Sequence, residues 1–272
     1  MSRRNRLRTS FGNEVHQGAW PHHVLIFRLY NKLKFQYRAF CAGSIIGEKR
    51  VLTSTNCFFT NRKNPRHKFD QVRFVAGILK TRGTEPIHDD IEQWRKLERV
   101  YTQKFYRFPA FNLAVVVLTK PWVFNTYVNK IPYATKEQDF DGVCTATAVK
   151  ATRSWSTIKY LYTQEVEMVP REECEKILCR SCRLFMCTVF NNRNQYAYSE
   201  TEGGGLVCYE TGDPAEVDIN QGVLVAVTSI VNIGLPNLNM RVGLFSQWVT
   251  DVSCDVYVNK FVMVLCILML CY

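Results

Sequence analysis

Cys179 and Cys182 stand in the letters CRSC, with the spacing at which two thiolates bind one zinc ion. A complete structural site needs two more ligands, usually a second cysteine pair or two histidines. The sequence offers neither beside this pair. We therefore predict no metal and no cofactor, and we interpret the two cysteines as a local bridge or an additional staple in a loop.

The histidines offer no obvious general base. They stand at positions 16, 22, 23, 67 and 88. His22 and His23 are the one adjacent pair, and in a strand their side chains would point to opposite faces. We expect these side chains to lie at the surface or at the edge of the core.

Eleven cysteines in 272 residues indicate an oxidising compartment, because cytosolic thiols are kept reduced. We therefore expect a secreted, extracellular protein with disulfide bonds. The opening letters MSRRNRLRTSFGNEV have the positive start of a signal peptide but no apolar stretch behind it. Either the start is incomplete or export uses another route, and the sequence does not choose between them.

Twelve apolar residues, FVMVLCILMLCY at 261–272, follow Lys260. As a helix they would cover roughly 18 Å, which is less than the ~30 Å hydrocarbon core of a bilayer, so we do not expect a spanning helix. One interpretation is the tail of a glycolipid-anchor signal, attached near Ser253, Cys254 and Asp255. The other is an exposed terminus that associates loosely with a membrane or a partner. The pairing of Cys254, Cys266 and Cys271 stays open.

The formal net charge is +11, and basic residues cluster at 3–8 and 61–68. Such a charge attracts polyanions without naming one, and a solvated loop face is the simpler interpretation. The basic runs are not interleaved with stacking aromatic residues, and no finger or recognition helix accompanies them. The sequence therefore excludes the known nucleic-acid modules.

Short apolar runs, rich in Val, Ile, Thr and aromatic residues, recur between turn signals. They lie at 22–30, 44–54, 72–79, 113–118, 144–151, 164–169 and 222–231. This spacing predicts a single all-β unit, a barrel or a sandwich. Only 244–252 has the periodicity of a helix, with Leu244, Trp248 and Val249 on one face.

Several of these segments resemble those of one family in their letters, order and separation. They are GAWPHHVLIFRL, FCAGSIIGEKRVLTSTNC, FNLAVVVL, VEMVPREEC, EGGGLVC, GVLVAV and FSQWV. Together they are similar to the chymotrypsin/trypsin-like serine proteases. The resemblance implies an all-β, double six-stranded β-barrel with a C-terminal helix. It also implies a basic segment at 1–8, a trypsin-like domain at 9–252 and an apolar tail at 253–272.

The resemblance implies three disulfides as well. By the family's pairing they join Cys41 to Cys57, Cys144 to Cys208 and Cys174 to Cys187. A fourth family bridge would need cysteines near Tyr198 and Ile230, and both are absent.

The resemblance places Asn56, Leu113 and Glu202 where the family has its catalytic residues. The family's mechanism needs a hydroxyl nucleophile, an imidazole base and a carboxylate that orients the imidazole. An amide is not basic enough to take a proton from a hydroxyl, and a leucine cannot orient an imidazole. Glu202 could act as a nucleophile only beside a second acid or base, as in glycosidases, and the sequence shows none. We expect no enzymatic activity.

The loop before Glu202 departs from the family in two further ways. Glu200 stands at the oxyanion-hole glycine, where a charged side chain opposes a developing negative charge. Thr201 stands at the aspartate that pairs with the new N-terminus of activated family members. If the chain is cleaved between Arg8 and Thr9, the new N-terminal ammonium therefore has no buried carboxylate with which to form an ion pair. Whether that bond is cleaved stays open.

The substrate pocket is also altered in this interpretation. Tyr196 falls at the pocket floor, and Val227 and Asn237 fall on walls that are usually glycine. Such a cleft is a poor receptor for Lys or Arg.

The resemblance thus implies a non-catalytic serine protease homologue, a pseudoenzyme that acts by binding proteins. Its implied partners are active serine proteases or their substrates, in proteolytic cascades or extracellular recognition. A second interpretation is a basic protein that binds heparin-like polyanionic glycans or acts as an antimicrobial protein. A third is residual serine-type endopeptidase activity at an unrecognised site.

Overall fold

Strands make up most of the regular structure in the computed structural model of this chain. It describes residues 13–61, 63–86, 91–140, 144–151, 158–178, 180–190, 202–232 and 234–253. The strands are β1 (Asn13–Glu14), β2 (His23–Asn31), β3 (Gln36–Gly47), β4 (Arg50–Thr53), β5 (Phe59–Asn61), β6 (Asn64–Pro65), β7 (Val72–Ala76), β8 (Arg82–Thr84), β9 (Gln93–Thr102), β10 (Ala114–Leu118), β11 (Cys144–Ala151), β12 (Lys159–Val169), β13 (Phe185–Phe190), β14 (Gly205–Cys208), β15 (Val223–Ile230) and β16 (Asn237–Arg241).

The first β-barrel is closed by six antiparallel strands. Their order is β2-β7-β9-β10-β4-β3, and pairing of β2 with β3 closes the ring. Strand β8 extends the sheet beyond β3. The apolar run at 44–54 forms parts of two strands, because the chain turns between Gly47 and Arg50.

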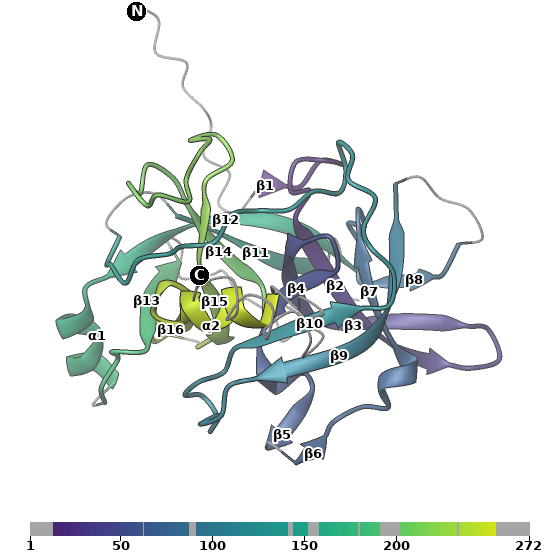
Figure 1. The fold of residues 1–272 in the computed structure, drawn as a ribbon, viewed down its shortest axis with the longest axis horizontal. Helices are drawn as coiled ribbons and strands as arrows, with labels where there is room; N and C mark the ends of the chain where they lie inside the picture. Colours follow the sequence, from purple (N-terminus) through teal and green to yellow (C-terminus); the bar gives the residue numbers. More distant parts are fainter. Residues whose placement is uncertain are drawn as a thin grey trace, which may run out of the picture.

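The second β-barrel repeats this arrangement with β12-β11-β14-β15-β16-β13, closed by pairing of β12 with β13. Strand β1 is added at β12, where Asn13 lies opposite Thr163. Figure 1 shows the two barrels side by side, with the first at the right and the second at the left. The predicted double six-stranded β-barrel is confirmed.

Apolar side chains fill each barrel and the space between the two. Phe74 and Val116 belong to the core of the first barrel, and Val166 and Leu206 to that of the second. A further cluster joins the barrels, because Leu52 of β4 packs in the same buried group as residues of β14 and β15. The site described below lies beside this shared core.

Three disulfides tie the strands together, with the pairing that the family resemblance implies. Cys41–Cys57 links β3 to the turn after β4, Cys144–Cys208 joins β11 to β14, and Cys174–Cys187 joins a helix to β13. A disulfide contributes roughly 2–4 kcal/mol to folding stability.

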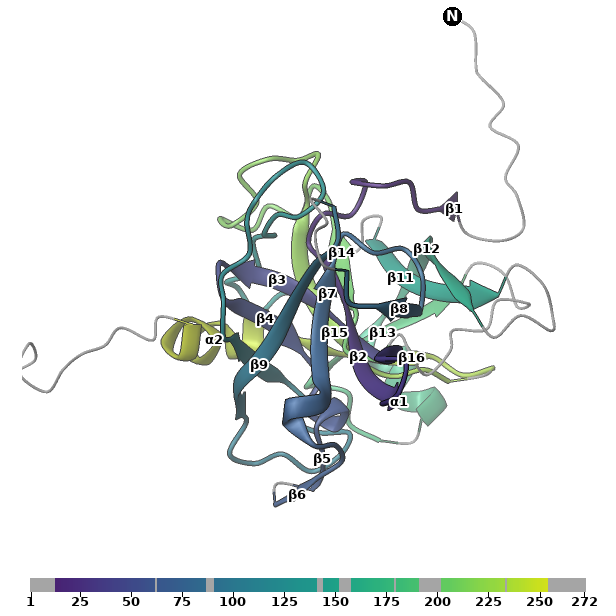
Figure 2. The ribbon, with the colours of Figure 1, turned by 90° about the vertical axis from the view of Figure 1, so that its right-hand side faces the viewer.

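Two α-helices are present among the described residues. Helix α2 (Ser246–Ser253) follows a 3₁₀ turn at Gly243–Phe245 and matches the predicted C-terminal helix. In Figure 1, α2 lies in front of the barrels, and Figure 2 shows it at the left side of the molecule. Helix α1 (Arg171–Leu178) was not predicted, because its eight letters REECEKIL are too few to establish a helical period. No helix among the described residues is long and apolar enough to cross a membrane.

Candidate functional site

Asn56 and Glu202 come from different barrels and meet at the junction between them. Asn56 lies in the 3₁₀ turn Thr55–Cys57, which follows β4, and Glu202 precedes β14. The turn is held by the disulfide from Cys57 to Cys41. The Nδ2 atom of Asn56 donates a hydrogen bond of 2.9 Å to Oε2 of Glu202.

Arg66 completes this contact from the exposed side. Its Nη2 atom donates a 2.6 Å hydrogen bond to Oδ1 of Asn56, so both polar atoms of the Asn56 side chain are occupied. Burial raises the pKa of Glu202, although the hydrogen bond from Asn56 and the charge of Arg66 oppose that rise. Sequence reasoning missed Arg66, which lies in the basic run 61–68 that we interpreted as a solvated face.

Tyr106 lies on the same side of the junction. Its side chain is buried, and its hydroxyl donates a 3.4 Å hydrogen bond to the carbonyl of Phe59. Burial raises the pKa of Tyr106, the charge of Arg66 lowers it and the charge of Glu202 raises it. Tyr106 is therefore electrostatically coupled to both charged members of the cluster.

Asn112, and not Leu113, is the residue that contacts Asn56 where the family has its orienting carboxylate. This corrects the expectation that Leu113 takes that place. Oδ1 of Asn112 accepts a 2.8 Å hydrogen bond from the backbone N–H of Asn56. Nδ2 of Asn112 donates a 2.8 Å bond to Oγ of Ser229. Leu113 is fully buried in the core cluster that joins the barrels, so its side chain points away from the site. Only its carbonyl takes part, accepting a 2.9 Å bond from Thr55 Oγ1.

The backbone around Glu202 is fixed by its neighbours. The carbonyl of Glu202 accepts a 2.8 Å hydrogen bond from the N–H of Ala42, and the N–H of Gly203 donates a 2.9 Å bond to Thr228. Gly203 has a φ of +81°, and a Cβ there would lie 2.2 Å from Oγ1 of Thr53 and 2.4 Å from the carbonyl of Ala42. Only glycine fits at this position.

The described histidines do not take the place of a base beside Glu202. His22 and His23 are buried, and the ring of His22 lies 5.0 Å from that of Trp20. Burial lowers the pKa of His22 to about 3, helped by the charge of His23, and lowers that of His23 to about 4. The ring of His67 packs against Phe40 at 4.3 Å.

Several residues that the resemblance assigned to the site fall outside the described ranges. These are Arg8, Thr9, Tyr196, Glu200 and Thr201.

The two described pocket positions, Val227 and Asn237, are both buried. Val227 is fully buried in the core cluster between the barrels. Asn237 is 4% exposed, and its Oδ1 atom accepts a 2.9 Å hydrogen bond from the N–H of Asn232. Neither side chain is therefore free to contact a substrate.

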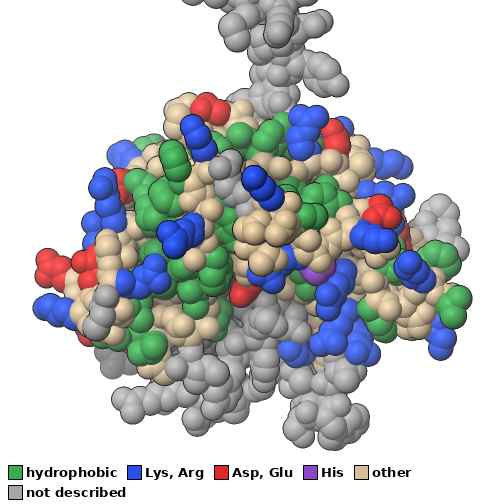
Figure 3. Space-filling view, turned by 90° about the horizontal axis from the view of Figure 1, so that it is seen from below, with side chains coloured by type: hydrophobic (Ala, Val, Ile, Leu, Met, Phe, Trp, Pro, Cys, Tyr) green, Lys and Arg blue, Asp and Glu red, His purple; other side chains and the backbone are tan. Residues whose placement is uncertain are grey.

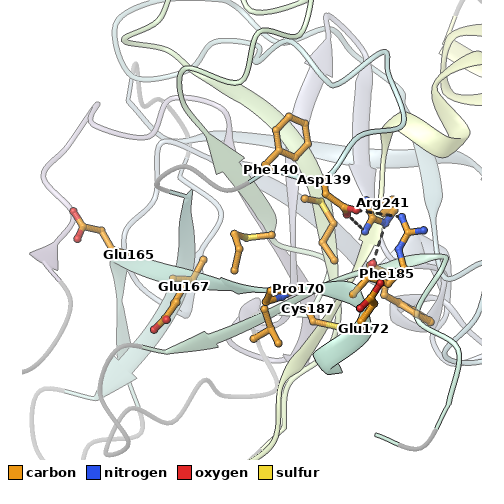
Figure 4. Close-up of a pocket in the computed structure, with 14 residues that line it drawn as sticks. Asp139, Phe140, Glu165, Glu167, Pro170, Glu172, Phe185, Cys187 and Arg241 are labelled. Carbon is orange, nitrogen blue, oxygen red and sulfur yellow. Dashed lines mark hydrogen bonds and ion pairs between the residues drawn. The ribbon is translucent and has the colours of Figure 1, made fainter. Parts of the chain in front are cut away.

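A large cavity of about 990 Å³ lies at the second barrel, beside β12, β13 and α1. None of its lining residues belongs to the Asn56–Glu202 cluster. Figure 4 shows Asp139 and Arg241 at one end of this cavity and Glu165 at the other. Asp139 binds Arg241 and also Arg171, the latter at 3.4 Å. This cavity is separate from the junction between the barrels.

A cluster of three sulfur atoms is the one arrangement among the described residues that resembles a metal site. The Sγ atoms of Cys174, Cys182 and Cys187 lie within 4.8 Å of one another. Cys174 and Cys187 share a disulfide, so only the buried Cys182 has a free thiol. Cys182 Sγ lies 3.6 Å from Cys174 Sγ, and the suggested bridge from Cys182 to Cys179 involves a residue that is not described.

The arrangement at the junction is a hydrogen-bonded chain from Arg66 through Asn56 to Glu202, with Asn112 and Ser229 behind it. An amide group neither gains nor loses a proton near neutral pH, so Asn56 and Asn112 can orient neighbours but cannot carry a proton. Within this series of hydrogen-bonded side chains, the carboxylate of Glu202 is the group that can carry a proton.

Comparison with known proteins agrees with the architecture. The trypsin family model matches residues 10–249. Coagulation factor IX of Cavia porcellus is 25% identical over 221 residues, which make up 76% of this chain and 67% of that protein. Coagulation factor IX of Oryctolagus cuniculus is 30% identical over 130 residues, which make up 46% of this chain and 40% of that protein. The match to the family model covers most of the chain and coincides with its two six-stranded barrels, so this chain belongs to the trypsin family.

Proposed function

We propose that this protein is a non-catalytic member of the trypsin family that acts by binding other proteins. The observation that carries the proposal is the 2.9 Å hydrogen bond between Asn56 Nδ2 and Glu202 Oε2, closed on its other side by Arg66. The family's chemistry needs a base and a hydroxyl in contact. Here an amide and a carboxylate are in contact instead.

Replacement of the catalytic residues by these groups should lower the rate of peptide hydrolysis by many orders of magnitude. Losing one member of the catalytic unit typically lowers turnover by about 10⁴ to 10⁶. Losses within the catalytic unit are not additive, so the neutral amide of Asn112 at the orienting position agrees with this figure and does not multiply it. The position of Glu200 at the oxyanion loop, which the resemblance implies, adds roughly another 10² to 10³. Together these losses leave a peptidase reaction below detection.

Exposed aromatic side chains beside the cluster support a binding role. Phe105 and Phe108 are 66% and 44% exposed and flank the buried Tyr106. The ring of Phe105 lies 6.0 Å from that of Phe111, which immediately precedes Asn112. Exposed aromatic residues are enriched in protein interfaces, where a large rigid ring becomes buried. We call the exposed side chains of Phe105 and Phe108 the aromatic rim. We infer that this rim contacts an active serine protease or one of its substrates.

The disulfides support an extracellular place of action. Three bridges stabilise the two barrels, and such bonds persist in oxidising compartments. A partner in extracellular recognition or in a proteolytic cascade fits that compartment. A glycolipid anchor, which would replace the apolar tail, is the alternative for this end of the protein, and the intact mass of the natural protein tests it.

A phosphonate probe tests the non-catalytic half of the proposal. The probe labels an activated serine, so the purified protein should remain unlabelled under conditions in which trypsin reacts to completion. Peptide substrates should show no turnover above buffer. Labelling of the wild-type chain would instead support the endopeptidase interpretation and overturn the proposal.

Affinity capture tests the binding half. The disulfide-bonded protein is immobilised and exposed to native extracellular fluid, and retained proteins are identified by mass spectrometry. The double variant Phe105→Ala/Phe108→Ala should lose the retained partner. The matched variant Tyr30→Ala/Leu33→Ala removes exposed apolar side chains from the β2–β3 hairpin and should keep it. Equal retention by both variants would exclude the aromatic rim as the binding surface.

A polyanion-binding function is the second candidate, and a group of cations on one face favours it. Figure 3 shows Lys and Arg side chains gathered on the face seen from below. Lys63, Arg66 and Lys68 are exposed in the segment 63–68, and the charges of Arg28 and Arg66 help burial to lower the pKa of His67. Cations that lie close together attract sulfated glycans.

Heparin chromatography tests this second candidate. Retention should weaken steeply with salt, because binding releases counterions. The variant Lys63→Glu/Lys68→Glu should elute at lower salt than Lys32→Glu/Lys34→Glu, which changes the same charge on the β2–β3 hairpin. Passage of the wild-type protein through the column at low salt would exclude the candidate.

A further inference from the structure

An apolar groove lies between the segment that connects the two barrels and the loop that precedes β15. Its volume is about 490 Å³. Its apolar lining residues are Ile46, Ile131, Pro132 and Tyr133 on one side and Ala215 and Val217 on the other, and Asn129, Lys130, Thr135 and Gln221 complete the lining. The groove shares no residue with the Asn56–Glu202 cluster, so a ligand here would leave that cluster untouched.

The loop at 211–221 is held firmly against the connecting segment. Asp213 accepts hydrogen bonds of 3.0 Å and 2.9 Å from the N–H and hydroxyl of Thr135, and 3.1 Å from the N–H of Lys136. Gln221 Nε2 donates a 2.8 Å bond to the carbonyl of Lys130. Burial acts to raise the pKa of Asp213, but the hydrogen bonds that it accepts from Ala215, Lys136 and Thr135 outweigh burial, and the pKa is lowered. The groove is therefore formed before any ligand arrives.

The tip of this loop presents apolar side chains to solvent. Val217 is 92% exposed and Ile219 is 60% exposed. Glu216 braces the tip by accepting hydrogen bonds of 2.7 Å and 2.6 Å from the N–H groups of Glu210 and Thr211. A braced loop that holds two apolar side chains beside an apolar groove indicates a surface that another apolar segment covers.

Helix α2 ends close to this groove. The hydroxyl of Tyr133, one of the lining residues, lies 2.9 Å from Oγ1 of Thr250, in the last turn of α2. The chain therefore leaves α2 at Ser253 within one helical turn of the groove. The apolar segment 261–272 begins eight residues later and lies outside the described residues.

We propose that the apolar segment 261–272 folds back onto this groove and covers Val217 and Ile219. Eight residues can span up to about 26 Å, so the connection is long enough to reach any part of the groove. The segment has no charged side chain, and six of the ten residues that line the groove are apolar. Docking in cis also avoids the entropy that a second molecule would lose on association.

Disulfide trapping tests the proposal with the native tail cysteines. Val217→Cys is introduced into the full chain in which Cys179 and Cys254 are replaced by Ser, which leaves Cys266 and Cys271 as tail thiols. Val217 is almost fully exposed, so this substitution should not disturb folding. After mild oxidation, peptide mapping should find the thiol introduced at position 217 bonded to Cys266 or Cys271 within one molecule. The matched variant Leu33→Cys, at a side chain that is 94% exposed on the β2–β3 hairpin, should give at least tenfold less of this product.

Two other occupants of the groove give different outcomes. If a second copy covers it, the bond will join two molecules and the product will run as a dimer on a non-reducing gel. If the tail enters a bilayer instead, phosphatidylcholine vesicles will retain the protein and abolish the bond. Equal yields for the Val217 and Leu33 variants, or either of these two results, would overturn the proposal.

Hydrogen exchange gives an independent measurement. In the full chain the amides of 129–135 and 211–221 should exchange more slowly than in a chain that ends at Ser253. The exchange of β9, which lies in the first barrel, should be the same in both. Unchanged exchange at 211–221 after removal of the tail would contradict docking in the groove.

Discussion

Asn112 accepts a hydrogen bond of 2.8 Å from the backbone N–H of Asn56, and its own amide donates to Ser229 at 2.8 Å. Asn112 thus connects the turn of the first barrel to β15 of the second. In the family's mechanism, the carboxylate that orients the imidazole must lie beside the base. The residue in that place here is Asn112.

Reconstruction of a catalytic unit should therefore need Asp at 112. We expect the triple variant Asn56→His/Asn112→Asp/Glu202→Ser to react slowly with a fluorophosphonate, while the wild-type protein does not react. Adding Glu200→Gly should raise the labelling rate by on the order of 10² to 10³, because it restores the glycine of the oxyanion loop. The rate of labelling is measured by intact mass spectrometry.

The control places the carboxylate one residue later. Leu113 is fully buried in the core between the barrels, so Leu113→Asp puts an unpaired polar group in an apolar environment. We expect the free energy of unfolding of Asn56→His/Leu113→Asp/Glu202→Ser to fall by at least the roughly 2–5 kcal/mol that a buried Leu→Ala change costs. We also expect this variant to show no labelling. Labelling of this variant at the rate of the first would show that 113 faces the site.

The orienting position was assigned to Leu113, one residue away from Asn112, and this error shows what the sequence could not predict. The approximate strand positions follow from the apolar runs, whereas the three disulfides and the double barrel follow from the resemblance to the family. Both kinds of prediction tolerate an offset of one residue. The face on which a side chain lies does not tolerate it, because successive residues of a strand point to opposite sides. The three-dimensional contacts place Asn112, and not Leu113, beside Asn56.

Arg66 and α1 could not be predicted for other reasons. Arg66 reaches Asn56 because the short β5–β6 hairpin returns the chain beneath the 3₁₀ turn, and this is a tertiary effect without a local signal. Helix α1 has only eight residues, of which five are charged, so its apolar residues Cys174, Ile177 and Leu178 give a helical period over a single turn. The disulfide from Cys174 to Cys187 holds it against β13.

Removing the charge of Glu202 should stabilise the protein at neutral pH. Burial raises the pKa of Glu202 in the folded state, so the folded protein binds this proton more tightly than the unfolded chain does. The favourable contribution is present below the unfolded pKa, near 4.5, and is lost as the pH rises through the folded value. We expect Glu202→Gln to melt at the same temperature as the wild type at pH 4 and at a higher temperature at pH 7. Glu98→Gln, at an exposed position of β9, should show no such pH-dependent gain.

The two buried histidines should make the fold sensitive to acid. Burial lowers the pKa values of His22 and His23 to about 3 and about 4, below the 6.5 of an exposed histidine. The unfolded chain therefore takes up protons first, and the stability that is complete above pH 6.5 falls as the pH drops toward these folded values. Each histidine should contribute a slope of about 1.4 kcal/mol per pH unit. Urea unfolding at pH 7, 6 and 5 measures the slope.

Substitution of these histidines gives the comparison. His22→Gln/His23→Gln should unfold more easily at pH 7 but lose most of the decline between pH 7 and 5. His16→Gln, at an exposed side chain, should keep the wild-type slope. An unchanged slope in the double variant would assign the acid sensitivity to other groups.

Glycine at 203 should be far less replaceable than glycine at 212. Both have positive φ, +81° and +67°, so an alanine at either costs roughly 1–2 kcal/mol of backbone strain. At 212 a Cβ meets nothing within 4 Å, whereas at 203 it would lie 2.2 Å from Thr53 Oγ1 and 2.4 Å from the carbonyl of Ala42. Overpacking adds roughly 1–3 kcal/mol, so Gly203→Ala should lose roughly 2–5 kcal/mol in urea unfolding. The same clash should displace Glu202 from Asn56, because the carbonyl of Glu202 is bonded to the N–H of Ala42. Equal losses in the two variants would mean that the turn after Glu202 is not packed against the first barrel.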